Sequence, residues 1–181
     1  MPARLPPLDP AALTADQQRV AAEIAGARKG LRGPFPAWLR NPKLAEHANA
    51  FGIALRDSKH IDRRLFELVV LTVCRAWSVQ YAWSAHVGAA ETAGLAPEVI
   101  AAIRDNRRPD FKRDDERLVH DVATEIMQTK DLSQATYDRA IAQFGAEGAV
   151  DLISTVGFYA MVGIFLKGFD VPTPTGDRPL K

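Results

Sequence analysis

Two side chains near the middle of the chain are of types that could transfer protons. Glu67 is followed at once by Leu-Val-Val-Leu, and His86 lies among alanine, tryptophan and valine. A histidine, with an ordinary pKa of about 6.5, both accepts and donates protons near neutral pH. A carboxylate at the edge of an apolar helix must reach solvent or find a partner, because an unpaired buried charge is costly. Taken alone, each residue would more commonly serve packing or lie on the surface.

Glu67 and His86 can face one cavity only if the helix between them is broken. The chain reads helical over 62–93. One straight helix of that length would be roughly 48 Å long, whereas a domain of this size is only about 40 Å across. On a straight helix the nineteen-residue spacing also separates the two side chains by roughly 100°. We therefore predict a break at 77–78, with Ser78 capping a new helix that begins at Val79.

The rest of the chain shows helical spacing of apolar residues and no strand alternation. The sequence therefore predicts one all-α domain over 14–170, between an irregular arm (1–13) and a proline-rich tail (171–181). Helices are expected over about 14–30, from about 37 with an interruption or restart at 41–42, over 42–56, 62–77 and 79–93, from 97, over 118–127, from 131 to 144 and over 147–168. A turn is expected at 33–36 and a charged connector at 104–117. Thr14 with Gln17, and Asp131 with Gln134, should cap two of these helices, and Gly94 and Gly145 should end two others.

Composition limits the classes of function. The chain has 181 residues and a net charge of +1 with both signs interspersed, which argues against nucleic-acid binding. Its single cysteine excludes an intrachain disulfide and, with no signal-like N-terminus, favours the cytoplasm. The apolar run 152–166 is too short to span a bilayer comfortably. We interpret it as a buried helix that also packs against a partner chain, and we expect no membrane association.

Several common site motifs are absent from the sequence. The four histidines, His47, His60, His86 and His120, lie far apart without metal-ligand spacing. No Walker loop, GxGxxG or GxSxG occurs. We therefore expect neither a metal nor a cofactor.

The central run resembles the carboxymuconolactone decarboxylase and alkylhydroperoxidase D superfamily. The matching elements are Glu67, Tyr81-Ala82-Trp83, His86, Ala90 and Gly94, and the Glu67-to-His86 spacing agrees. The resemblance extends weakly over about 33–170, through Gly33-Pro-Phe, Asn41-Pro42, Leu44 and Val156-Gly-Phe-Tyr, around a core at about 60–110. It implies an alkylhydroperoxidase D-like helical bundle that assembles as a dimer, trimer or hexamer.

The sequence departs from the redox members of that superfamily at one decisive place. Those members carry two cysteines three residues apart, the second four residues before the histidine; Val79 and Ala82 occupy these positions here. Thiol peroxidase chemistry by that route is thus unavailable to this chain. The remaining cysteine, Cys74, lies in a run of valine and leucine, and we interpret it as a core residue with a raised pKa.

The resemblance implies a site with a small-molecule substrate. His86 would be the catalytic acid and base, and Glu67 its partner. Tyr81, Trp83, Ala82 and Val79 would line the pocket, and Arg63 or Arg64 could hold a substrate carboxylate. The first hypothesis is cofactor-free decarboxylation, or a related proton transfer, on a small organic acid or lactone. The alternatives are a peroxidase-related protein and a non-catalytic oligomeric binding protein.

Overall fold

The computed structural model describes residues 4–28 and 30–180, which form helices and irregular segments without a strand. The all-α prediction is therefore confirmed for this part of the chain. The elements are η1 (Pro10–Ala12), α1 (Ala15–Arg28), α2 (Phe35–Trp38), α3 (Pro42–Arg56), α4 (Arg63–Ala76), α5 (Gln80–Thr92), α6 (Pro97–Arg104), α7 (Asp114–Thr129) and α8 (Gln134–Gly168). The predicted capping box opens α1, with Thr14 N donating to Gln17 Oε1 at 3.0 Å and Gln17 N to Thr14 Oγ1 at 3.2 Å.

Three helix starts differ from the sequence-based expectation. Ser133 caps α8 through its hydroxyl, which accepts from Thr136 N, so the predicted cap at Asp131 is wrong. α2 begins at Phe35, inside the predicted turn. α7 begins at Asp114, inside the predicted connector, because three acidic residues in its first turn complement the positive end of the helix dipole.

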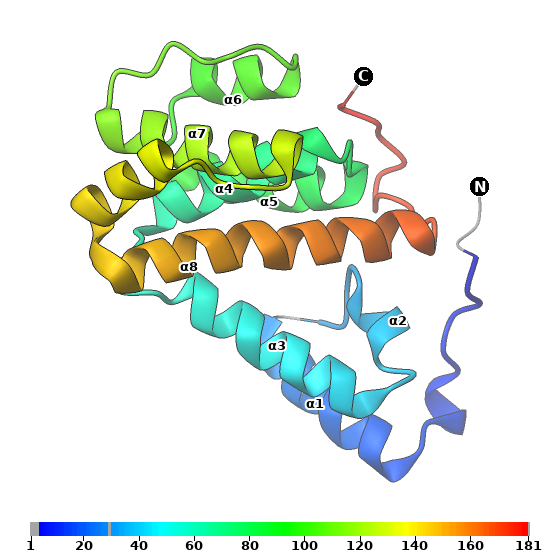
Figure 1. The fold of residues 1–181 in the computed structure, drawn as a ribbon. Coiled ribbons are helices and arrows are strands. Elements are labelled where there is room, and N and C mark those ends of the chain that lie inside the picture. Colours follow the sequence, from blue (N-terminus) through cyan, green and yellow to red (C-terminus); the bar gives the residue numbers. More distant parts are fainter. Residues whose placement is uncertain (1–3, 29, 181) are drawn as a thin grey trace.

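α4 is the centre of the fold. Every residue from Leu65 to Cys74 is buried, as expected for a helix enclosed on all sides. α4 makes its most extensive contacts with α5, α7 and α8. In Figure 1, α8 crosses the molecule between two groups of helices, with α4 to α7 on one side and α1 to α3 on the other.

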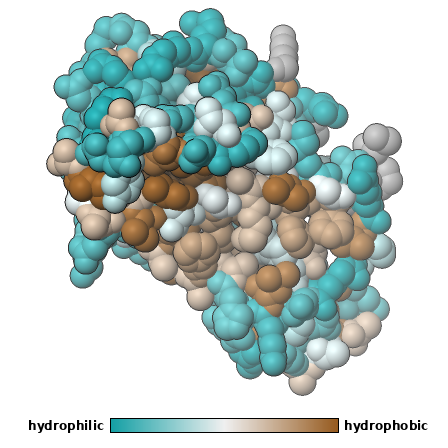
Figure 2. All heavy atoms as spheres, viewed as in Figure 1, coloured by the Kyte–Doolittle hydropathy of each residue, from teal (hydrophilic) through white to brown (hydrophobic). Residues whose placement is uncertain are grey.

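α8 combines a kink with an exposed apolar side. Gly145 has φ 68° and ψ 178°, so the chain bends there between two helical pieces, where the sequence predicted an end (Figure 1). By length and composition α8 is long and apolar enough to cross a membrane, and half of its most apolar stretch is buried in the fold. Val150, Ile153 and Ile164 remain exposed, and Figure 2 shows apolar side chains gathered along this helix. Association with a partner chain there stays a prediction.

The turn between α4 and α5 reverses the chain at the predicted break. Val79 N donates to the Cys74 carbonyl at 2.8 Å and Ser78 N to the Arg75 carbonyl at 3.0 Å, which is the Schellman arrangement that ends a helix. Ser78 takes the left-handed conformation (φ 50°) that this motif requires. Ser78 therefore ends α4 and does not cap α5, whose N-cap is Val79 without a side-chain hydrogen bond.

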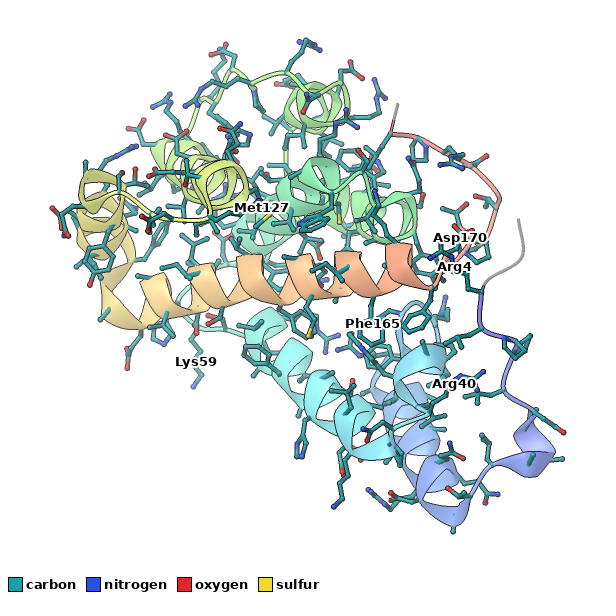
Figure 3. The ribbon with its side chains drawn as sticks, turned by 45° about the vertical axis from the view of Figure 1, so that its right-hand side comes forward. Arg4, Arg40, Lys59, Met127, Phe165 and Asp170 are labelled. Carbon is teal, nitrogen blue, oxygen red and sulfur yellow. The ribbon has the colours of Figure 1, made fainter. Side chains whose placement is uncertain are left out.

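Both irregular terminal segments pack against the helices. Arg4 N donates to the Phe169 carbonyl at 2.9 Å, which places the arm beside the end of α8, and Figure 3 shows Arg4 next to Asp170. At the other end, Gln80 Nε2 donates to the Leu180 carbonyl at 2.7 Å, and Leu180 N donates back to Gln80 Oε1 at 2.9 Å. The tail is therefore held against the first turn of α5.

We expect Gly163→Val in α8 to lower the free energy of unfolding by about 1–3 kcal/mol. A Cβ at Gly163 would lie 3.0 Å from Val79 Cγ2 and 3.6 Å from Trp77 Cβ, so a larger side chain pushes on the α4–α5 turn. Gly157→Val is the matched control, because a Cβ there meets nothing within 4 Å. Urea denaturation of both variants measures the difference; equal losses would contradict close packing on the turn.

A second prediction concerns His120, which is buried on α7 with its ring against Phe111. Burial, and secondly the charge of Arg108, lower the pKa of His120 to about 4. Between pH 6.5 and 4 the unfolded chain therefore binds a proton that the folded chain does not, so stability is lost as pH falls through this range. We expect this residue to lower the free energy of unfolding by about 2 kcal/mol at pH 5 relative to pH 7. Urea denaturation should show a correspondingly smaller pH difference in His120→Phe; an unchanged difference would contradict the assignment.

Candidate active site

The reversal after α4 brings Glu67 and His86 into direct contact. Nδ1 of His86, on α5, lies 2.8 Å from Oε2 of Glu67, on α4. The Glu67 side chain is fully buried, whereas 22% of the His86 side chain is exposed. The predicted break thus brings the two side chains together although they are nineteen residues apart. A partly exposed imidazole contacts a buried carboxylate as a result.

A tyrosine that the sequence analysis did not select completes this group. Tyr159 of α8 places its hydroxyl 3.3 Å from Nε2 of His86. The two rings pack edge to face with centroids 5.1 Å apart, and Phe66 packs on the tyrosine from α4. Both nitrogens of His86 therefore have a fixed partner, each from a different helix.

Arg63 supplies a positive charge beside the buried carboxylate. Its Nη2 lies 2.6 Å from Oε1 of Glu67, one helical turn away, and 44% of the Arg63 side chain is exposed. The contact lacks hydrogen-bond geometry, and Oε1 has no hydrogen-bond partner. Oε1 is therefore the less satisfied of the two carboxylate oxygens.

These contacts define the direction of the hydrogen bonds. An ionised carboxylate only accepts, so Nδ1 of His86 donates to Glu67 and the neutral ring keeps its lone pair on Nε2. The hydroxyl of Tyr159 then donates to Nε2. Burial, and secondly the Glu67 carboxylate, raise the pKa of Tyr159, so its hydroxyl keeps the proton. Tyr159, His86 and Glu67 form a continuous chain through which a proton can be passed.

Known proteins resemble this chain in part of its sequence and in its fold. Residues 42–124 match the sequence profile of the Carboxymuconolactone decarboxylase family. Similar solved structures include an alkylhydroperoxidase AhpD core, an uncharacterized peroxidase-related protein from Ralstonia eutropha JMP134; it is 17% identical, the match covers 94% of this chain and 92% of that one, and the TM-score is 0.78. This segment of the chain therefore resembles the carboxymuconolactone decarboxylase family, and the described residues share the fold of the alkylhydroperoxidase AhpD core.

Two further solved structures share this fold. The debrominase Bmp8 is 16% identical over 94% of this chain and 91% of that one, with a TM-score of 0.75. An uncharacterized peroxidase-related protein from Silicibacter sp. TM1040 is 16% identical over 93% and 90%, with a TM-score of 0.74. No protein of curated function matches the sequence. At these identities the likeness supports the fold alone.

The residues expected to line a pocket do not gather around His86. Val79, Ala82 and Trp83 are buried in the core. The Tyr81 hydroxyl accepts from Gly33 N at 3.0 Å. Tyr81 and Val79 instead line a cleft of about 270 Å³ beside the C-terminal segment, which neither Glu67 nor His86 lines. The common cavity expected at Glu67 and His86 therefore stays a prediction, and 22% of the His86 side chain is exposed.

Only one of the two candidate arginines reaches the pair. Arg64 binds Glu116 at 2.5 Å and Asp115 at 2.8 Å, both on α7, and only 11% of its side chain is exposed. Helix spacing would allow Arg64 to reach Glu67, three residues away, but these two carboxylates of α7 hold its guanidinium instead. Of the two alternatives, Arg63 is thus the arginine beside the pair, and contact of either with a substrate carboxylate stays a prediction. Among the described residues, no three His, Cys, Asp or Glu side chains are placed to hold a metal.

We expect the thiol of Cys74 to be unreactive in the folded protein. The residue is 1% exposed, and burial, followed by the Glu67 carboxylate, raises its pKa far above the usual range. Ellman's reagent at pH 8 should leave the native thiol unmodified over hours and label one equivalent in guanidinium chloride. Rapid labelling of the native protein would contradict the burial of Cys74.

Proposed function

We propose that this chain is a cofactor-independent enzyme that uses Glu67 and His86 as an acid–base pair on a small organic acid or lactone. The observation that supports the proposal is the contact between a fully buried carboxylate and a histidine that is itself partly exposed. Glu67 fixes the orientation of the ring and compensates the positive charge that forms when Nε2 takes up a proton. The same arrangement serves decarboxylation and related proton transfers.

Decarboxylation would proceed at Nε2 of His86, the nitrogen on the side away from Glu67. The bond between the substrate carbon and its carboxylate breaks, carbon dioxide leaves, and the electron pair moves into a conjugated carbonyl of the substrate. The protonated imidazole then gives its Nε2 proton to the carbon and is reprotonated from solvent. The Tyr159 hydroxyl, held in its protonated form by burial, can donate a hydrogen bond to the oxygen that gains negative charge.

Arg63 is the residue suited to the substrate carboxylate. Its guanidinium already lies beside the pair, and its exposed half is available to a ligand from solvent. A planar guanidinium binds a carboxylate through two parallel hydrogen bonds, which would orient the bond to be broken. Arg63 would thus position the substrate next to Nε2.

The redox alternative is less well supported. Several proteins with this fold are described as peroxidase-related, and Bmp8 is a debrominase. Here the two family cysteine positions hold Val79 and Ala82. The remaining thiol is buried with a raised pKa. A non-catalytic binding role is the third alternative, and it requires no contribution from the proton chain.

A panel of unsaturated lactone acids and aromatic-catabolism acids, assayed for carbon dioxide release, tests the proposal. For the substrate found, we expect His86→Gln to lower kcat by roughly 10²- to 10⁴-fold, because the proton donor is lost. Tyr159→Phe should lower kcat with an unchanged fold, whereas Tyr81→Phe is the matched control and should leave it unchanged. Arg63→Gln should act mainly on KM.

Three outcomes would contradict this assignment. His86→Gln with wild-type turnover would remove the catalytic role of the pair. Loss of a measured hydroperoxide reduction or tribromopyrrole debromination in Cys74→Ser, but not in His86→Gln, would establish the redox alternative. Absence of turnover across the panel, together with wild-type ligand binding in the His86 variant, would favour the binding protein.

A further inference from the structure

A second cleft lies on the other side of α4 from Glu67. It has a volume of about 530 Å³ and is formed by α4, by the segment that follows α6 and by α7. Figure 3 labels Met127, one of its lining residues, on α7. The volume falls within the range of small-molecule sites, which is roughly 300–1,000 Å³. The lining residues are Thr72, Arg75, Ala76, Ile103, Asn106, Arg107, Arg108, His120, Thr124, Met127 and Gln128.

Arg75 is the unusual residue of this cleft. Its Nε and Nη1 atoms are both buried and have no hydrogen-bond partner. Buried donors are almost always paired, so two unpartnered N–H groups on one partly buried arginine are unusual. The lining contains no aspartate or glutamate that could neutralise this guanidinium. No side chain that lines the cleft therefore carries a negative charge to balance the Arg75 guanidinium.

The surrounding side chains increase the positive character of the cleft. Arg108 pairs with Asp121 at 2.6 Å and Arg107 with Asp105 at 3.4 Å, but neither carboxylate lines the cleft. His120 lies at the buried end; its pKa is lowered to about 4, so at neutral pH it offers a hydrogen bond without a charge. Three arginines thus surround a space with no lining carboxylate.

We propose that this cleft binds a small oxyanion, a carboxylate or phosphate group, with Arg75 as the anchor. The oxygens of such a group would accept from the unpartnered Nε–H and Nη1–H of Arg75 and from the exposed ends of Arg107 and Arg108. Guanidinium groups are the usual partners of both kinds of oxyanion. The site lies apart from the Glu67–His86 pair and does not depend on the function proposed for that pair.

Calorimetric titration with inorganic phosphate and, separately, with acetate tests the proposal in the full chain at constant ionic strength, with chloride as the reference anion. We expect saturable binding of at least one of the two, and the arm that saturates identifies the group. Arg75→Met, which keeps the aliphatic stem, should weaken that binding at least tenfold. Arg104→Gln is the matched control and should leave it unchanged, because Arg104 is exposed and lies outside the cleft.

Two further measurements keep the result interpretable. Without anion, Arg75→Met should melt at or above the wild-type temperature, because it removes two buried N–H groups that have no hydrogen-bond partner; a much lower melting temperature would show a structural role instead. In the wild type, the Nε–H signal of Arg75, assigned by its absence in Arg75→Lys, should shift on titration. Failure of both anions to saturate, or binding unaffected by Arg75→Met, would overturn the proposal.

Discussion

The rest of this structure depends on one constraint, which is that the buried carboxylate of Glu67 must be compensated by neighbouring groups. Removing a charge from water costs several kcal/mol even after the protein has relaxed around it. Glu67 is fully buried in α4, so the fold must bring compensating groups to it. His86 and Arg63 do so at 2.8 Å and 2.6 Å. Loss of either partner would leave the charge poorly compensated, and this ties the position of α5 to that of α4.

The same requirement explains why the turn after α4 is built so tightly. Two nested backbone hydrogen bonds end the helix at Ser78, and Lys167 Nζ of α8 donates to the Trp77 carbonyl at 2.9 Å. Gly163 lets α8 approach this turn closely. As a result the Tyr159 hydroxyl of α8 lies beside Nε2 of His86. A carboxylate, an imidazole and a phenol from three helices thereby contact one another in sequence.

The sequence predicted the helices and the meeting of Glu67 with His86, because both follow from apolar spacing, chain length and helix geometry. It misplaced caps such as Ser78, since a serine at a break can either end one helix or begin the next. Tyr159 was missed because it lies in a helix that is apolar on nearly all sides; only the Val156-Gly-Phe-Tyr resemblance indicated it. Helix spacing could not separate Arg63 from Arg64, because residues three and four positions from Glu67 are both its neighbours; the pairing of Arg64 with α7 decided between them. The cleft at Arg75 could not be foreseen, since it requires the packing of the segment after α6.

The proton chain is tested most directly by the tautomer of His86. Long-range proton–nitrogen NMR of the neutral ring distinguishes protonated Nδ1 from protonated Nε2. The structure predicts a proton on Nδ1, directed at Glu67, with unprotonated Nε2 beside Tyr159, and a mixture of the two forms in Glu67→Gln. A proton on Nε2 in the native protein, unchanged by that substitution, would contradict the account.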